Sequence, residues 1–332
     1  MIKTARLMSL TLSALLVAAM TLVPNIGHAQ KTRLAFSGGP DGGTFQYFSN
    51  GMATRLSKTI PNVEVSNMAS AGSVENLRRV NSGEADFGIS YSGDTYLART
   101  GQLPKDTRKY ENVHALAYLY GAPAHLIVLD GSGINAVSDL AGKRIAVGGA
   151  GSGAAASAQR YFEALGLWDK MNVEFIGYSK AASALGDKLI DAMWVFAGFP
   201  NSSVIQAAAS NKIKILSLYE AGEKGGAFKK YPFYSPVTIP AGTYSGIDYD
   251  VKTFQDSALW VAGKHVDSEV IYQVTKDIFT PEGLSYLVKV KSTAKAMSVE
   301  GALTGIVTPV HEGAEKLWKE KGLTLTPEQT AR

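Results

Sequence analysis

The feature that most constrains the fold is a layout of strands, glycine-rich turns and helices that the chain contains twice. The first copy opens with an apolar strand at residues 32–36, a glycine-rich turn at 37–44 and a helical stretch. The second copy opens in the same way, with a strand at 143–147 and a turn at 148–153. A second strand, a second helix and a third strand follow each time. Such alternation predicts small parallel sheets with right-handed helical crossovers.

Smaller details recur between the two copies. Asn-Val-Glu occurs at 62–64 and again at 172–174, and an aspartate opens the third strand each time, Asp86 and then Asp191. Regular alternation of helices and strands produces some echoes by itself, but the shared order and turn chemistry favour two related lobes. We interpret the two aspartates as groups that bind backbone N–H at a strand start, rather than as a catalytic carboxylate pair.

The length of 332 residues corresponds to about two typical domains. The tail after Pro240 returns to strand and helix patterns, so we expect it to pack back onto the first lobe. The fold class predicted is α/β, with two lobes, each a small and mostly parallel sheet with helices on both faces, and a cleft between them. The predicted division is a signal peptide at 1–29, a discontinuous first lobe at 30–132 and 241–332, and a second lobe at 133–240.

The N-terminus matches the pattern of a secretory signal. Lys3 and Arg6 precede an almost wholly apolar run at 7–23, and small residues lead up to Ala29. This pattern predicts export to the periplasm with cleavage after Ala29. The alternative is a retained anchor, for which the apolar run is marginal because about 30 Å of hydrocarbon must be crossed. Nothing after Gln30 resembles a membrane span, so we expect a mature chain that does not cross the membrane.

Composition narrows the function classes. Loss of the leader lowers the formal net charge from +4 to +2, and the basic residues are scattered, so no nucleic-acid partner is expected. The chain has no cysteine, which excludes thiol chemistry and a disulfide framework. The four histidines of the mature chain match no metal-ligand spacing, so no metal site is expected; they are His114, His125, His265 and His311.

The catalytic and cofactor motifs are incomplete. Residues 149–154 fit a dinucleotide-binding pattern, but Glu174 lies near the start of the next strand, whereas a ribose-binding acid follows its end. Ser152 is not in a nucleophile elbow, and Lys143 is not in a Walker motif. We therefore predict a binding protein without a cofactor, not an enzyme. Glycine-rich turns at strand ends suit this role, because they let backbone N–H groups approach an anion at a helix start.

Nine segments occur in order along nearly the whole mature chain, at 38–44, 72–77, 82–86, 139–144, 151–153, 191–192, 197–201, 239–244 and 311–315. This set resembles the TAXI family, the solute-binding subunits of a class of TRAP transporters. The resemblance implies a type II periplasmic binding-protein fold that closes on its ligand. It also implies delivery of that ligand to membrane TRAP subunits, which use an ion gradient. The ligand implied is a small anion, a carboxylate or an amino acid such as glutamate.

The resemblance places the ligand site at both glycine loops, a helix start, a strand end and the turn at 198–201. The expected ligand-binding residues are Gly38, Gly39, Gly43, Thr44, Phe45, Ser73, Asn76, Tyr91, Ser92, Gly151, Ser152, Gly153, Gly198, Phe199, Pro200 and Asn201. Among them, we expect the side chains of Ser73, Asn76, Ser92 and Ser152 to orient the anion together with backbone N–H groups.

The chain departs from the family pattern within these segments. The first loop of the family runs on to two tyrosines and a proline, where this chain has Phe45, Gln46 and Tyr47. A Gln and an Asp after the third strand are replaced by Tyr91 and Gly93, and a Thr after the second loop is replaced by Ala154. The resemblance therefore does not assign the ligand. A periplasmic ligand-sensing subunit of a signalling receptor with the same fold is the alternative function.

Overall fold

The computed structural model describes residues 31–104 and 106–330. From Arg33 onward the chain forms one compact α/β unit. The predicted signal peptide at 1–29 lies outside the described residues. Within residues 31–104 and 106–330, no helix combines the length and the apolar character that crossing a membrane requires.

The first copy of the repeated layout folds into the predicted elements, which are β1 (Thr32–Ser37), α2 (Thr44–Thr59), β2 (Val63–Met68), α3 (Ser73–Ser82) and β3 (Phe87–Tyr91). A further helix that the sequence did not predict, α4 (Ser92–Thr100), follows β3 directly. β1 and β3 are parallel neighbours. α3 ends at Gly83, whose φ of 78° is the left-handed conformation that terminates many helices. The glycine-rich turn at 37–44 directly follows β1, so it lies at the carboxyl end of this strand, as the sequence predicts.

The second copy repeats this order. Its elements are β5 (Arg144–Ala146), α5 (Gly153–Ala164), β6 (Asn172–Glu174), α6 (Tyr178–Gly186), β7 (Ala192–Phe196) and α7 (Ser202–Ser210), followed by β8 (Ile213–Leu216), α8 (Tyr219–Lys224), α9 (Ala227–Lys230) and β9 (Ser235–Ile239). β5 pairs in parallel with both β6 and β7. The two copies thus build the same kind of βαβ unit.

The two recurring aspartates have the same structural role in both copies. Asp86 Oδ2 accepts a hydrogen bond from Ala35 N at 2.7 Å, and Asp191 Oδ2 accepts one from Arg144 N at 2.8 Å. Each carboxylate thereby ties the start of the third strand to the first strand of its copy. This geometry confirms their interpretation as strand-start groups.

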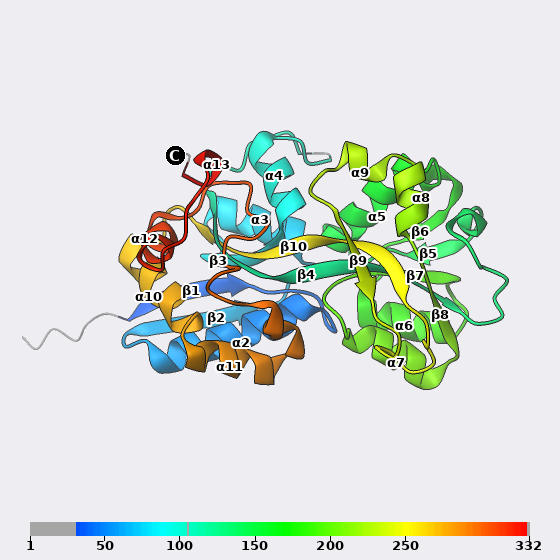
Figure 1. Ribbon diagram of the computed structural model, residues 1–332, viewed down its shortest axis with the longest axis horizontal. Coiled ribbons are helices and arrows are strands. Elements are labelled where there is room, and N and C mark those ends of the chain that lie inside the picture. The colour runs from blue at the N-terminus through cyan, green and yellow to red at the C-terminus, as the bar shows by residue number, and fades with distance from the viewer. Residues whose placement is uncertain (1–30, 105, 331–332) are drawn as a thin grey trace, which may run out of the picture. The chain divides into compact units, whose positions relative to one another are not determined.

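Two long strands, β4 (Val113–Leu129) and β10 (Val251–Gly263), run between the two copies (Figure 1). They pair antiparallel from Gly263 opposite Val113 to Gln255 opposite Pro123. The strand order is β2-β1-β3-β10-β4-β7-β5-β6, with β8 paired to β4 and β9 paired to β10. The sheet is therefore mixed, because β4 and β10 run antiparallel to β7 and β3, respectively.

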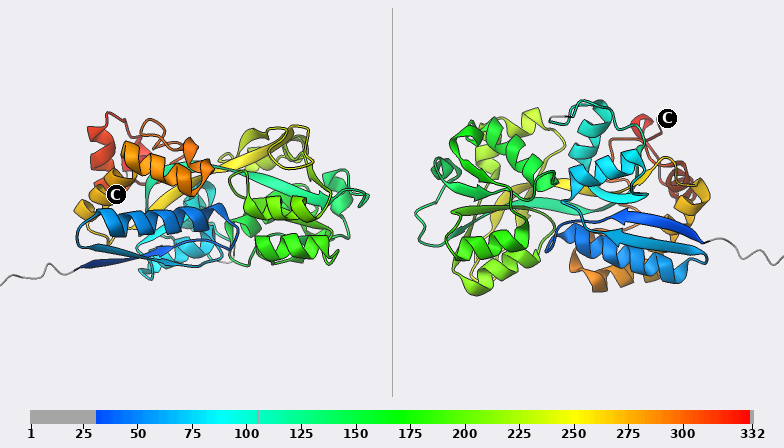
Figure 2. Two further views of the ribbon diagram at one scale, coloured as in Figure 1. Left: turned by 90° about the horizontal axis from the view of Figure 1, so that it is seen from below. Right: turned by 180° about the vertical axis from the view of Figure 1, so that it is seen from behind.

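Helices cover both faces of the sheet (Figures 1 and 2). In the first copy, α2 and the later α11 (Pro281–Val290) lie on one face and α3 and α4 on the other. The other helices of the tail are α10 (Ser268–Ile278), α12 (Glu312–Glu320) and α13 (Pro327–Thr330). α10 and α11 pack beside α2, and α12 packs beside β4, as expected for a tail that returns to the first copy. The exact lobe boundaries at 132/133 and 240/241 stay a prediction.

Candidate functional site

A small cavity lies at the carboxyl ends of β3 and β7, where both glycine-rich turns approach each other. Its wall combines residues of both copies: Pro40, Gly43, Thr44, Phe45, Ala71, Gly72, Ser73, Tyr91, Ser152, Gly153, Ala154, Tyr178, Phe196 and Ala197. Ligands of open α/β sheets bind at this edge of the strands. The cavity volume of about 10 Å³ has room for about one water molecule.

Four helices begin at this cavity. Its wall contains the first residues of α2, α3, α5 and α6, which are Thr44, Ser73, Gly153 and Tyr178. The first N–H groups of a helix have no partner within the helix, and the N-terminus carries a partial positive charge. No residue in the described wall is Asp, Glu, Lys, Arg or His. The site therefore favours an anion through backbone dipoles and hydroxyl groups.

The first glycine loop reaches across to the second copy. The carbonyl of Gly42 accepts hydrogen bonds from Asn201 Nδ2 at 3.1 Å and from Ser202 Oγ at 3.0 Å. Gly42 has a φ of 74°, and a Cβ there would lie 2.2 Å from Ser203 Oγ and 2.7 Å from Ser179 Oγ. Only glycine permits both this backbone conformation and this close approach. Gly42 therefore lets the loop touch the starts of α6 and α7.

The second glycine loop reaches back to the first copy. Ser152 caps α5, because its Oγ accepts a hydrogen bond from the backbone N–H three residues later at 3.0 Å. The carbonyl of Gly151 accepts a hydrogen bond from Glu75 N, in the first turn of α3, at 3.1 Å. A Cβ at Gly153 would lie 2.5 Å from Cδ2 of Tyr91. The start of α5 is thereby packed directly against the first copy.

The predicted ligand-binding residues fall into two groups. Those in the cavity wall are Gly43, Thr44, Phe45, Ser73, Tyr91, Ser152 and Gly153. Those that the cavity wall does not include are Gly38, Gly39, Asn76, Ser92, Gly151, Gly198, Phe199, Pro200 and Asn201. The second group contributes backbone turns and hydrogen bonds that hold the wall in place.

Asn76 illustrates this supporting role. Its Nδ2 donates to the carbonyls of Gly38 at 2.7 Å and Ile89 at 2.8 Å, and its Oδ1 accepts from Ser37 Oγ at 2.7 Å. The side chain thus ties the first glycine loop to β3. Similarly, Ser92 Oγ donates to the carbonyl of Gly305 at 2.5 Å, which anchors the start of α4 to the C-terminal tail.

The turn at 198–201 also supports the wall. Its Gly198 carbonyl accepts a hydrogen bond from Thr44 Oγ1 at 3.4 Å, and its Pro200 carbonyl accepts one from Lys291 Nζ at 2.9 Å. Asn201 Oδ1 caps α7 by accepting from Ser203 N at 2.9 Å. The turn therefore connects the first glycine loop to both α7 and the C-terminal tail.

Several wall residues were not among the predicted ones: Pro40, Ala71, Gly72, Ala154, Tyr178, Phe196 and Ala197. Phe196 and Ala197 follow from the rule that ligands bind at the carboxyl ends of strands, since β7 ends at Phe196. Tyr178 has no comparable signal, because only the fold brings the start of α6 to this cavity.

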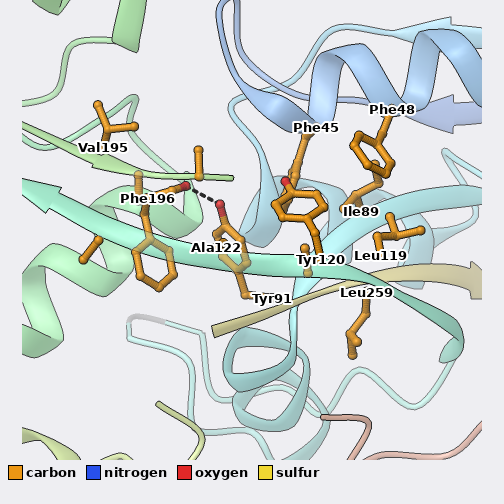
Figure 3. Packing of buried hydrophobic residues seen from close by; sticks show 14 of the residues in the cluster. Phe45, Phe48, Ile89, Tyr91, Leu119, Tyr120, Ala122, Val195, Phe196 and Leu259 are labelled. Carbon is orange, nitrogen blue, oxygen red and sulfur yellow. Dashed lines mark hydrogen bonds between the residues drawn. The ribbon is translucent and has the colours of Figure 1, made fainter. Parts of the chain in front are cut away.

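Aromatic side chains of the cavity wall pack against one another (Figure 3). The Tyr91 ring lies 4.9 Å from the ring centroids of both Phe45 and Phe196, and its hydroxyl donates to the Phe196 carbonyl. The hydroxyl of Tyr178 donates to the same carbonyl at 3.0 Å. Burial raises the pKa of Tyr91 well above its usual value, so this phenol stays protonated and remains a donor.

A buried charge cluster lies beside the cavity. Arg160 of α5 has its Nη2 2.8 Å from Asp94 Oδ1 of α4, and a Cβ at Gly153 would lie 2.7 Å from Asp94 Oδ2. Asp256 of β10 accepts a hydrogen bond from Gly93 N at 3.1 Å. Burial, followed by the charge of Asp94, raises the pKa of Asp256 to about 8. The cluster thus joins α4 to α5 behind the cavity wall.

The fold brings two of the histidines together, with the ring centroids of His114 and His311 6.0 Å apart. Burial lowers the pKa of His114 to about 4. Among residues 31–104 and 106–330, no three or more His, Cys, Asp or Glu side chains are grouped so that they could hold a metal ion.

Comparisons with known proteins give one family match and several similar solved structures. A model of the NMT1-like family matches residues 36–322. MatC from Rhodopseudomonas palustris with bound malate is 16% identical over 87% of this chain and 96% of its own, with a TM-score of 0.51. The alkanesulfonate-binding protein SsuA from Xanthomonas axonopodis pv. citri bound to MOPS is 14% identical over 88% and 92%, with a TM-score of 0.47. The likeness to MatC concerns the fold, and the predicted α/β fold class is confirmed, with a sheet that is mixed.

Proposed function

Since the chain belongs to the NMT1-like family, we propose that it is a periplasmic solute-binding protein, which captures one small anion and delivers it to a membrane transporter. The observation that carries the proposal is the convergence of four helix N-termini on one cavity whose described wall has no charged side chain. Each favourably placed helix terminus stabilises an anion by roughly 0.3–1 kcal/mol. Both copies of the layout contribute to this wall, so binding there links them.

The small size of the cavity implies that the protein opens to admit a ligand and then closes around it. A volume of about 10 Å³ is too small for a metabolite, so the two walls must separate to admit one. The polar contacts that hold them together include the Asn201–Gly42 and Glu75–Gly151 hydrogen bonds and the buried Arg160–Asp94 ion pair. After closure, the hydroxyls of Thr44, Ser73 and Ser152 lie in the wall, where they orient the ligand.

The transporter that we propose is of the TAXI type of TRAP system, on the strength of the nine ordered segments. Carboxylates are the first ligand class to test, because MatC holds malate and the resemblance implies glutamate or a related anion. The genes beside this one test the choice of partner. Genes for TRAP membrane subunits would support it, a gene for an ATP-hydrolysing subunit would replace it with an ABC permease, and a histidine kinase gene would favour sensing.

The binding function itself is tested by thermal unfolding of the mature protein with malate, glutamate, ethanesulfonate and phenylacetate. Malamide, ethanesulfonamide and phenylacetamide are the uncharged controls. At a concentration of one hundred times Kd, a ligand of the folded state adds about 2.7 kcal/mol to the free energy of unfolding. We expect at least one anion to raise the melting temperature by several degrees and its amide to leave it unchanged. Equal effects of anions and amides, or none from either, would rule out the proposed anion site.

A further inference from the structure

Tyr91 occupies the middle of the candidate site. It is the last residue of β3 and directly precedes α4, and only 4% of its surface is exposed. Its ring lies between Phe45 of the first copy and Phe196 of the second, with 4.9 Å between ring centroids on each side (Figure 3). Aromatic pairs at this separation attract each other beyond their burial. The phenol therefore fills the space between the two walls.

The contacts of Tyr91 bridge the two copies. Its hydroxyl donates to the carbonyl of Phe196 at the end of β7, and its ring packs against Gly153 at the start of α5. A ligand held by the helix starts of α3 and α5 would have to occupy the same volume. The Tyr91 side chain thus fills the position of a bound ligand. It supplies the apolar body and the hydroxyl donor that the ligand would otherwise supply.

We infer that the Tyr91 side chain is an internal plug in the position of the ligand's apolar body, and that a ligand binds by displacing it. This inference rests on the proposed binding function and names the ligand class, which is an anion with a flat apolar or aromatic body. The body lies between Phe45 and Phe196, and the anionic group faces the helix starts. Tyr91 must leave the site before a ligand binds. The apparent affinity therefore equals the intrinsic affinity multiplied by the fraction of molecules in the open state.

Tyr91→Ala removes the plug and leaves a space of the size of a phenol. The probes are 4-hydroxyphenylacetate, which combines that phenol with a carboxylate, and its uncharged amide, measured by titration calorimetry. We expect the variant to bind the carboxylate at least tenfold more tightly than the wild type does, and at least tenfold more tightly than it binds the amide. The control Tyr91→Phe keeps the ring in place and should match the wild type within about threefold.

Three results would overturn the plug. They are equal affinity of the wild type and Tyr91→Ala for the carboxylate, no binding by the variant, and equal affinity of the variant for carboxylate and amide. If Tyr91→Ala does not give a cooperative unfolding transition, Tyr91→Leu, which also lacks the ring, replaces it under the same criteria. Failure of the binding function is recognised separately, because it is measured on the wild-type protein with a panel of aliphatic and aromatic anions.

Discussion

Asp256 is a carboxyl group in an unusual setting. It is 1% exposed and lies in one cluster with Asp94 and the single guanidinium of Arg160. The guanidinium also donates to Tyr234 OH at 2.8 Å and lies over the ring of Phe233. One cation does not balance two ionised carboxylates, so the cluster holds a proton. That proton resides on Asp256, whose pKa burial and the charge of Asp94 raise to about 8.

This proton makes stability depend on pH. Unfolded aspartate ionises near pH 3.9, whereas Asp256 in the folded protein keeps its proton up to about pH 8. Between these values the folded state binds more protons, so the contribution of Asp256 to the free energy of unfolding falls as pH rises and levels off above about pH 8. The decline should be on the order of a few kcal/mol.

Asp256→Asn should remove this decline, because the amide carries no titrating proton and still accepts from Gly93 N. Urea unfolding at pH 5, 7 and 9 measures the effect, and the exposed Asp169→Asn serves as the control. The same pH slope in Asp256→Asn and in the wild type would contradict the assigned protonation.

At the scale of elements, the start of α5 contributes both to the stability of the fold and to the proposed binding site. Ser152 caps this helix and also lies in the cavity wall. Asp267 caps α10 in the same way, by accepting hydrogen bonds from Glu269 N and Val270 N at 2.9 and 3.1 Å, but it does not belong to the wall. The two caps therefore form a matched pair, one inside and one outside the proposed site.

Loss of either cap should lower the free energy of unfolding by about 1 kcal/mol. Ser152→Ala should in addition weaken binding of the stabilising anion about tenfold, because the N–H groups at the start of α5 lose their fixed direction. Asp267→Ala should leave that affinity unchanged. Denaturant unfolding and calorimetry of both variants check this prediction, and equal affinities in the two variants would place α5 outside the anion site.

The two βαβ copies were predictable because short apolar strands, glycine turns and helix starts are local signals. β4 was not, because it is an apolar run without alternation that contains Pro123, and proline within a run argues against a central strand. The glycine loops of the site were predictable for the same local reason. Tyr178 and the pairing of Tyr91 with Phe196 were not, since distant strand ends become neighbours only through the sheet order.

At the scale of the whole molecule, capture requires the cavity walls to separate while the chain stays folded. β4 and β10 extend between the copies and remain paired with each other along most of β10, so they suit the role of hinge. The contacts across the cavity are hydrogen bonds, the Tyr91 ring and the buried Arg160–Asp94 ion pair. Opening therefore breaks these contacts, and a bound anion must compensate for those that it replaces.

Native mass spectrometry of the gently purified mature protein tests the central claim most directly. The account predicts one small anion per chain, either retained during purification or taken up from a panel of carboxylates and sulfonates, and released when the protein is denatured. A folded chain that retains no anion, and takes none up from that panel, would contradict the account.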